Sequence, residues 1–321
     1  MQQGFAAIDI GSNTLRLLIA EPSAGRDKTH WHQLAYDHYI TRLGEGLHTE
    51  GRLGETGMAR ALEGLQQFAH RITEYGIAPE CVNAVATAAM REAKNGQTFL
   101  DRIGQETGIT PHIISGNEEA ATCLAGAASV LDEQTRRDML LFDIGGGSTE
   151  FIRAGNGLMR DAISRKLGVV RLVEAHLHSD PPSTADYRAM IDTAKQHLEQ
   201  VASFWKDAKP PSHLVGTAGT ITTLAAIHLE LVPYDAERVN NHVMLIEDVH
   251  MLRDHLLSMS HEQRTAIPAI EPGRADLIIA GLAIVEAVMR RWHYDRLVTV
   301  DAGLLEGAWL QAAASESRKV E

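Results

Sequence analysis

FAAIDIGSNTLRLLIA, residues 5 to 20, consists of two apolar runs separated by a short polar break. The break, DIGSNT at residues 9 to 14, has Gly11 and Asn13 at its centre, and this composition disfavours a helix and predicts a β-hairpin. The same design returns in LLFDIGGGSTEFIRA, residues 140 to 154. A chain that builds one unusual turn twice is expected to build it for one ligand.

Strands and helices intermix along the rest of the chain. Apolar residues at helical spacing from Met58 predict a helix ending at Gly76, and Ser115 and Glu118 have the spacing of a capping box that opens another. Further strands are predicted at 81–86, 112–114, 158–164, 213–216 and 297–300, and further helices at 99–106, 169–176, 185–205, 221–230, 247–259, 274–292 and from 304. This pattern indicates an α/β fold. The 321 residues suit two domains of about 150 residues, each beginning with one hairpin, with a ligand expected between the two turns.

The composition restricts the partners. Aromatic residues make up 5% of the chain and the formal net charge is −12, which argues against base stacking and against attraction to nucleic acid or acidic membranes. Cys81 and Cys123 are the only cysteines, so no disulfide framework or zinc cluster is indicated. The N-terminus lacks a signal-peptide pattern, and Glu286 interrupts the longest apolar stretch, residues 277 to 289. We therefore expect a soluble cytoplasmic protein with no nucleic-acid or membrane partner.

The two repeated turns have the composition of anion-binding loops. A turn rich in Gly, Ser and Thr exposes consecutive backbone N–H groups and lets a ligand approach without Cβ clashes. One such turn alone is an ordinary hairpin, but two matched copies favour a phosphate clamp. Asp9 and Asp143 precede the turns and would repel phosphate, so Mg²⁺ is the expected cofactor. The expected phosphate-binding residues are Gly11, Ser12, Asn13 and Thr14 in the first turn, and Gly145, Gly146, Gly147, Ser148 and Thr149 in the second.

A third anion-binding turn is suggested at Gly216, Thr217, Gly219 and Thr220. There a predicted strand runs into a predicted helix, whose first N–H groups would face a ligand. Taken alone, a glycine turn capped by Thr explains this segment equally well. Neither the P-loop motif G-x-x-x-x-G-K-[ST] nor the dinucleotide motif G-x-G-x-x-G fits the glycine-rich segments.

Glu118 and Glu119 are expected to have different roles. If Ser115 caps the helix, Glu118 reaches back to the cap, while Glu119 points to another face. A carboxylate at that face can accept a proton from an attacking water, although a first-turn Glu also suits the helix dipole. Glu150, just after the second turn, is the other candidate, as a metal ligand or a water-orienting group. Arg91, at the end of a predicted buried strand, is expected to enter a cleft between the domains.

Few other basic or histidine patterns are informative. Arg165, Lys166 and Arg171 form a second basic cluster, for which the alternative is a solvated face with salt bridges. The 16 histidines show no H-E-x-x-H or other metal-binding spacing, so we expect them to be surface or core residues.

Eight segments, in order along the chain, resemble the exopolyphosphatase and guanosine pentaphosphate phosphatase family. They are AIDIGSNTLRLLI, TRLGEGL (41 to 47), TAAMREAKN (87 to 95), ISGNEEA (114 to 120), LLFDIGGGSTEF, LGVVRLVE (167 to 174), GTAGTITTLAA (216 to 226) and DAGLLEGA (301 to 308). The resemblance covers about Ala6 to Ala308. Longer family members append a helical, HD-type domain, so this chain resembles the short form.

The resemblance implies the fold of the actin, hexokinase and Hsp70 superfamily. The expected α/β architecture has two actin-like (ribonuclease H-like) domains, residues 1–125 and 126–303, which flank an interdomain active-site cleft, and a final helix at about 304–321 packs back on the first domain. The implied activity is Mg²⁺-dependent removal of the terminal phosphate from inorganic polyphosphate or guanosine pentaphosphate, by a homodimer. The resemblance assigns Glu119 as general base, Arg91 as a phosphate contact, and Asp143, Glu150 and Asp9 as metal ligands.

The expected reaction is exopolyphosphatase hydrolysis, in which Glu119 activates a water for in-line attack on the terminal phosphoryl group. One alternative is a phosphatase that acts on guanosine pentaphosphate with the same residues. Another is a non-catalytic regulator that binds an alarmone or a nucleotide, which the presence of Glu119, Asp143 and Glu150 argues against. A sugar kinase would require its own catalytic Asp, for which the sequence gives no specific signal.

Overall fold

The computed structural model describes residues 3–23, 31–206 and 208–317, which fold into two compact units. Unit 1 consists of Met1–Ser129 together with Ala302–Glu321, and unit 2 consists of Val130–Asp301. Within the described ranges, no helix is both long enough and apolar enough to cross a membrane.

Unit 1 is built on a five-stranded sheet with the order β3-β2-β1-β4-β5. Its strands are β1 (Phe5–Ile10), β2 (Thr14–Pro22), β3 (Trp31–Ile40), β4 (Val82–Ala86) and β5 (His112–Ile113). The first three are antiparallel neighbours, and β4 and β5 extend the sheet in parallel. Every residue of β1 is buried, as expected for the central strand of a sheet covered on both faces.

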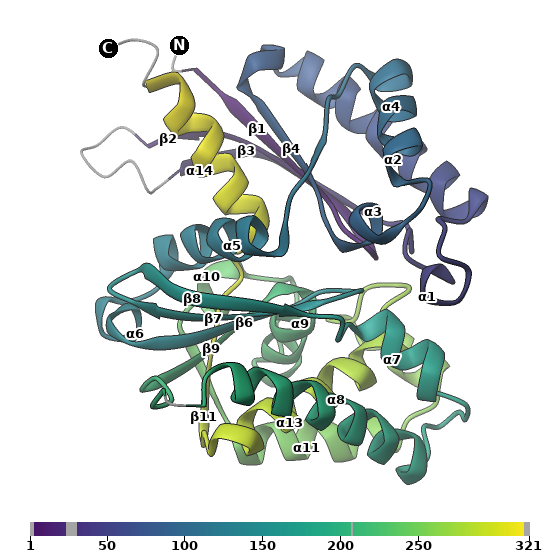
Figure 1. Cartoon of the computed structure of the whole chain (residues 1–321), viewed down its shortest axis with the longest axis vertical. Helices are drawn as coiled ribbons and strands as arrows, with labels where there is room; N and C mark the ends of the chain where they lie inside the picture. The colour runs from purple at the N-terminus through teal and green to yellow at the C-terminus, as the bar shows by residue number, and fades with distance from the viewer. Residues whose placement is uncertain (1–2, 24–30, 207, 318–321) are drawn as a thin grey trace. The chain divides into compact units, whose positions relative to one another are not determined.

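Helices cover both faces of this sheet (Figure 1). They are α2 (Glu55–Glu74) and α4 (Gly96–Thr107) on one side and α14 (Leu304–Ser317) on the other, and α5 (Gly116–Val130) packs against α14. Trp309 of α14 is fully buried, and its indole N–H donates to the carbonyls of Phe5 (3.1 Å) and Ala20 (3.3 Å). Helix α14 is thereby anchored on β1 and β2, the strands that form the first hairpin.

Unit 2 contains a six-stranded sheet with the order β10-β11-β9-β6-β7-β8. Its strands are β6 (Met139–Ile144), β7 (Thr149–Gly155), β8 (Leu158–Arg165), β9 (His213–Thr217), β10 (His242–Leu245) and β11 (Arg296–Thr299). Strands β6, β7, β8, β9 and β11 pair in the same way as β1, β2, β3, β4 and β5 of unit 1, with β10 added at the edge. The sequence repeat is therefore a repeat of topology.

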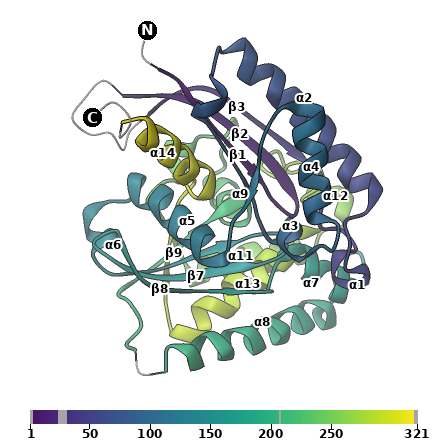
Figure 2. The same cartoon turned by 45° about the horizontal axis from the view of Figure 1, so that its top comes forward.

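A largely apolar helix forms the centre of unit 2. The main helices of the unit are α7 (Val169–His176), α8 (Thr184–Phe204), α9 (Ala218–His228), α11 (Ile246–Leu257) and α13 (Leu277–Trp292). Helix α13 packs against the other four, and both views place it beside α8 beneath the sheet (Figure 1 and Figure 2). Residues 277–289 are all buried, so the longest apolar stretch is core.

Most elements lie where the sequence predicts them, and both hairpins are confirmed. The capping box is also confirmed, because the Glu118 carboxylate accepts from the Ser115 N–H (2.8 Å) and the Ser115 hydroxyl accepts from the Glu118 N–H (3.2 Å). Strands β3 and β10 were not predicted. The remaining short elements are α1 (Leu47–Glu50), η1 (Pro79–Cys81), α3 (Ala88–Glu92), α6 (Glu133–Arg137), α10 (Ala236–Val239) and α12 (His261–Thr265).

Helices α5 and α14 approach so closely that only glycine fits at two positions. A Cβ on Gly126 would lie 1.9 Å from the Gly303 carbonyl oxygen, and a Cβ on Gly307 would lie 1.8 Å from the Thr122 carbonyl oxygen. Neither acceptor is the end of a flexible side chain, so substitution requires a shift of backbone. The helix that begins with the Glu118 and Glu119 turn is thus held directly against the last helix of the chain.

We predict that Gly307→Ala lowers the free energy of unfolding by about 1 to 3 kcal/mol, the usual cost of overpacking. Gly104→Ala is the matched control, because Gly104 also lies inside a helix and its added Cβ would meet only the Ile109 carbonyl oxygen, at 3.7 Å. The control should gain about 0.5 to 1 kcal/mol from helix propensity. Urea unfolding of both variants measures the difference, and equal stability of the two would contradict the close approach.

Candidate active site

The first turn, Gly11 to Thr14, is a tight connection between β1 and β2. The Gly11 N–H donates to the Thr14 carbonyl (2.9 Å), and a Cβ on Gly11 would lie 3.0 Å from that carbonyl oxygen. The carbonyls inside the turn accept hydrogen bonds from the segment that follows β3. These bonds run from Gly44 to Ser12 (2.7 Å) and from Thr41 and Arg42 to Asn13 (2.9 and 3.0 Å). The carbonyls of the turn therefore face the protein.

The second turn, Gly145 to Ser148, has the same construction. The Gly145 N–H donates to the Ser148 carbonyl (2.9 Å), and a Cβ on Gly145 would lie 3.1 Å from that oxygen. The carbonyls again face the protein, because the first turn of α7 donates to them. These bonds run from Val169 to Gly145 (3.1 Å), from Val170 to Gly146 (3.0 Å) and from the Arg171 Nε to Gly147 (2.8 Å). Arg171 of the predicted basic cluster thus supports the turn.

Both turns can bind an anion through backbone groups. Among the described residues, the N–H groups of Ser12, Asn13, Gly146 and Gly147 donate to no protein acceptor. Consecutive N–H groups in a tight turn form a concave site for phosphate-like oxygens. Gly168 packs directly against the second turn, since a Cβ on Gly168 would lie 2.2 Å from the Gly146 carbonyl oxygen.

Thr149, which we expected to contact phosphate, lies differently from its neighbours. Its side chain is fully buried, and its hydroxyl donates to the Leu167 carbonyl, so this hydroxyl serves to attach the second hairpin to the segment before α7. Ser148 is also buried, whereas Gly145 and Gly146 are partly accessible.

The two hairpins differ in charge at one matched pair of positions. In unit 1 Asp9 pairs in register with Arg16, whose Nη2 and Nε donate to the Asp9 Oδ2 at 2.6 and 3.0 Å. Burial lowers the pKa of Arg16, but the Asp9 carboxylate, together with Tyr36 and Glu306, outweighs burial and raises that pKa above its usual value. Asp9, expected as a metal ligand, is thus already paired with a cation through one oxygen, while its buried Oδ1 has no hydrogen-bond partner within the described ranges.

In unit 2 the corresponding pair is two acids, Asp143 and Glu150. Side chains directly opposite in an antiparallel pair lie on the same face, and like charges there are destabilising. Both are buried, with 7% and 1% of their surface exposed, and the Ser164 hydroxyl donates to the Glu150 Oε1 (2.6 Å). Where unit 1 places an arginine, unit 2 places a second carboxylate, which is the arrangement that a divalent cation would neutralise.

These residues fit Mg²⁺ by their chemistry. No group of three or more His, Cys, Asp or Glu side chains suited to a metal occurs in the part of the chain that the structure describes. Mg²⁺ requires no such group, because it is usually held by one or two carboxylates, waters and phosphate oxygens. Asp143 and Glu150 supply two carboxylates on one face of the hairpin.

The third turn lies where β9 ends at Thr217 and α9 begins at Ala218. Ala218 has a φ of 70°, a left-handed conformation that is strained for a residue with a Cβ and that concentrates at functional sites. Gly219 lies under the guanidinium of Arg274, since a Cβ on Gly219 would be 1.8 Å from its Nη1. Gly216, in contrast, lies within β9 and packs against Ile221, and Thr220 is buried.

Glu119 and Arg91 form an ion pair in unit 1. The Arg91 Nη1 donates to the Glu119 Oε2 (3.0 Å) and to the Ile114 carbonyl (2.7 Å). The Glu119 side chain is 7% exposed and that of Arg91 is 26% exposed. Arg91 does not lie at the end of a strand as expected: β4 ends at Ala86, and Arg91 lies on the short helix α3. The helical turn lets its guanidinium reach across to α5 and orient the carboxylate.

Arg16 and Arg274 were not among the predicted site residues. Arg16 could have been found from the sequence, because a four-residue hairpin turn places it opposite Asp9. Arg274 could not, since its contact with Gly219 joins the start of α13 to a turn far away in the chain. Of the predicted basic cluster, Lys166 is exposed and Arg165 is partly buried.

Comparisons with known proteins found a matching family model and similar proteins. Residues 20–316 match the model of the Ppx/GppA phosphatase family. Exopolyphosphatase 2 of Mycobacterium tuberculosis is 32% identical over 325 residues, covering 96% of this chain and 98% of that protein. The guanosine-5'-triphosphate,3'-diphosphate pyrophosphatase of Vibrio vulnificus is also 32% identical, and its match covers 94% of this chain but 58% of its own length.

A solved structure shares the whole fold. The crystal structure of the Aquifex aeolicus member of the Ppx/GppA protein family has a TM-score of 0.81 and 30% sequence identity, and the match covers 98% of each chain. The expected actin-like α/β architecture in two domains is thereby confirmed. A family model that spans most of the residues, with relatives of this identity and coverage, shows that the chain belongs to the Ppx/GppA phosphatase family.

Proposed function

We propose that the protein is an exopolyphosphatase that releases the terminal phosphate of inorganic polyphosphate by hydrolysis. The observation that supports this most strongly is the duplicated turn, in which matched glycines turn the carbonyls inward and leave N–H groups available to phosphate oxygens. Polyphosphate presents such oxygens on every phosphate unit of the polymer. The match with a relative named exopolyphosphatase, which covers 96% of this chain and 98% of that protein, also supports this substrate.

The chain's own residues provide positioning and a base. The N–H groups of the second turn bind oxygens of the terminal phosphoryl group, and those of the first turn and the Arg274 guanidinium bind further phosphate oxygens. Glu119, oriented by Arg91, accepts a proton from the water as its oxygen bonds to phosphorus. The bond from phosphorus to the bridging oxygen breaks, and the shortened polyphosphate leaves with that oxygen. Such transfers depend mainly on positioning and charge neutralisation.

Asp143 and Glu150 would hold Mg²⁺, and Asp9, whose Oδ1 is buried without a hydrogen-bond partner within the described ranges, is a further candidate contact through a water. When bound, the cation would neutralise charge on the phosphate oxygens.

The second candidate function is removal of the terminal phosphate of guanosine pentaphosphate, which the similarity to the Vibrio pyrophosphatase favours. Both substrates end in a phosphoanhydride, so the turns alone would serve either.

We predict that Glu119→Gln lowers the rate of phosphate release from short and long polyphosphate by about 10² to 10⁴-fold, the usual contribution of a general base. Release is measured side by side from these two substrates and from guanosine pentaphosphate. Faster release from polyphosphate supports the proposal, and faster release from the pentaphosphate supports the second candidate.

Glu118→Gln is the matched control, because Glu118 is the exposed neighbour whose carboxylate is engaged by the Ser115 N–H. It should keep full activity. Unchanged turnover in Glu119→Gln would exclude the proposed base, and no release from any substrate by the unmodified chain would indicate a protein that binds phosphate without cleaving it.

We further predict that chelation of Mg²⁺ stops phosphate release and that added Mg²⁺ restores it. Glu150→Gln should weaken binding of Mn²⁺, as a paramagnetic substitute, by at least about tenfold, since loss of even an outer-shell partner often costs that much. Electron paramagnetic resonance measures the bound fraction. The control is Glu133→Gln in the same unit, an exposed acid paired with Arg137, which should bind as tightly as the unmodified chain. Full activity in the chelator would contradict the metal proposal.

A further inference from the structure

Arg264 is an arginine buried in unit 2 that no step of the proposed reaction uses. It lies in the short helix α12 with 1% of its surface exposed, and it is among the largest fully buried side chains of the described chain. A buried charge is costly unless it is well hydrogen-bonded, so its partners indicate what the charge is needed for.

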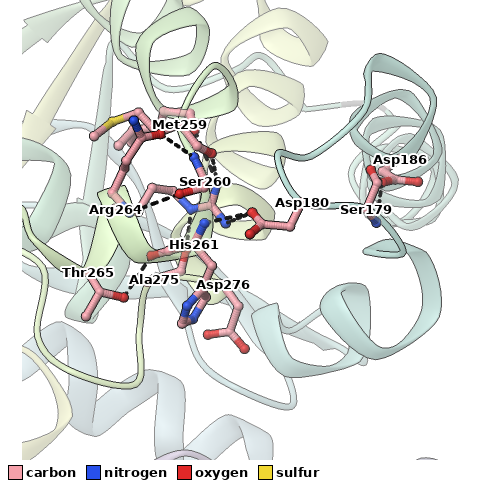
Figure 3. Close-up of polar contacts among 12 residues, drawn as sticks. Ser179, Asp180, Asp186, Met259, Ser260, His261, Arg264, Thr265, Ala275 and Asp276 are labelled. Atoms are coloured by element: carbon pink, nitrogen blue, oxygen red, sulfur yellow. Dashed lines mark hydrogen bonds and ion pairs between the residues drawn. The ribbon is translucent and has the colours of Figure 1, made fainter.

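Backbone carbonyls are its main partners (Figure 3). The Arg264 Nε donates to the Ala275 carbonyl (2.7 Å), and its Nη1 donates to the Met259 carbonyl (2.5 Å) and, at 3.5 Å, to that of Leu256. The carboxylate of Asp180 lies 3.6 Å from its Nη2 and also accepts from the His261 N–H at 2.7 Å. Burial lowers the pKa of Arg264, while Asp180 and then Asp276 oppose that shift.

The guanidinium thus joins two parts of the chain. Leu256 and Met259 lie at the C-terminal end of α11, where carbonyls lack helical partners and the helix dipole favours a cation. Ala275 lies on the approach to α13. Only the planar fork of arginine can donate in both directions at once. Arg264 therefore fixes the backbone at Ala275 relative to the end of α11.

The residue before Ala275 is Arg274, whose guanidinium lies over Gly219 in the third turn. The Arg274 Nε is 2.8 Å from the Glu271 Oε2, and the Arg274 N–H donates to the Glu271 carbonyl (3.0 Å). A displacement of the backbone at Ala275 would move the Arg274 main chain and so remove its guanidinium from Gly219. The buried arginine and the site arginine are therefore coupled through one peptide unit.

We propose that Arg264 is a positioning residue that holds Arg274 over the Gly219 turn, where Arg274 contacts a phosphate of the substrate. This role rests on the proposed function in one respect, namely that the third turn binds phosphate. Arg264 itself touches neither the turn nor the substrate, and it acts by holding the Ala275 carbonyl.

If Arg264 had a purely structural role, its substitution would lower stability in the same way. A buried charge elsewhere in unit 2 therefore serves as the control. Glu286 of α13 is 1% exposed and accepts from Tyr187 (2.7 Å) and Arg253 (3.0 Å). It contacts α8 and α11 rather than the segment before α13. Glu286→Gln should destabilise unit 2 without affecting Arg274.

The test is a double-mutant cycle of Arg264→Lys and Arg274→Ala, with tripolyphosphate as substrate. Lysine keeps the charge but cannot donate to both sets of carbonyls. Each single substitution should raise KM by about tenfold, the low end for loss of a charged hydrogen bond, with little change in kcat. In the Arg274→Ala background, Arg264→Lys should raise KM no further, because residues that act through one contact are not additive. Glu286→Gln should lower stability in urea and leave KM unchanged.

Three results would overturn the proposal: an unchanged KM in Arg264→Lys, a multiplicative effect in the double variant, or an equal rise in KM in Glu286→Gln. If Arg264→Lys does not fold, Asp180→Asn removes the charge facing Arg264 from a half-exposed position. Asp180→Asn should raise KM by less than Arg264→Lys does, and in the Arg274→Ala background it should not raise KM further. A further rise in that background would overturn the proposal.

Failure of the proposed function is distinguishable from failure of this proposal. If the unmodified chain releases no phosphate, the proposed function fails, and the same cycle is measured as the Kd of tripolyphosphate by calorimetry. The same non-additive weakening of binding supports the positioning role. Additive weakening, or no binding by the unmodified chain, overturns it.

Discussion

The hydrogen bond from Gly11 to the Thr14 carbonyl, and its counterpart from Gly145 to Ser148, determine what the rest of each unit must supply. A turn closed this tightly leaves little room for a Cβ at its first position. Its inner carbonyls need partners, and in each unit a following segment provides them, the 41–44 loop in unit 1 and the start of α7 in unit 2. Once the carbonyls are satisfied inside the protein, the N–H groups are the polar atoms left for a ligand. The anion binding that we propose would thus be a consequence of how the turns are closed.

The two hairpins differ at the position directly across the strand pair from the aspartate that precedes each turn, Asp9 in unit 1 and Asp143 in unit 2. Unit 1 pairs Asp9 with Arg16, its partner across the hairpin, so the carboxylate charge at that position is balanced by a cation of the chain itself. Unit 2 places Glu150 at the position that corresponds to Arg16, opposite Asp143. Two buried carboxylates on one face favour a bound cation, and a cation beside an anion-binding turn suits a phosphoanhydride. This difference would let one repeated element provide both a neutral clamp and the metal-assisted clamp that we propose.

Much of this arrangement could be predicted from the sequence because it depends on local patterns. The hairpins follow from apolar runs around Gly-rich breaks, and the separation of Glu118 from Glu119 follows from the capping box at Ser115. Strand β3 was missed because its face alternation is weak, with polar residues such as Gln33 and Asp37 in an edge strand. The Thr149 hydroxyl and the Arg274 guanidinium depend on contacts with Leu167 and Gly219, which are remote in sequence, and no local pattern indicates such contacts. The placement of a ligand between the two turns, the homodimer and the cytoplasmic location stay predictions.

The central claim is that both turns bind phosphate through their backbone N–H groups, and NMR can test it directly. Backbone amide signals of the Glu119→Gln variant, which should not consume the ligand, are followed while tripolyphosphate is added with Mg²⁺. We expect the amide signals of Ser12, Asn13, Gly146 and Gly147 to shift together and to saturate with one affinity. If these signals stay in place while amides elsewhere move, the turns are structural and the proposed site is wrong.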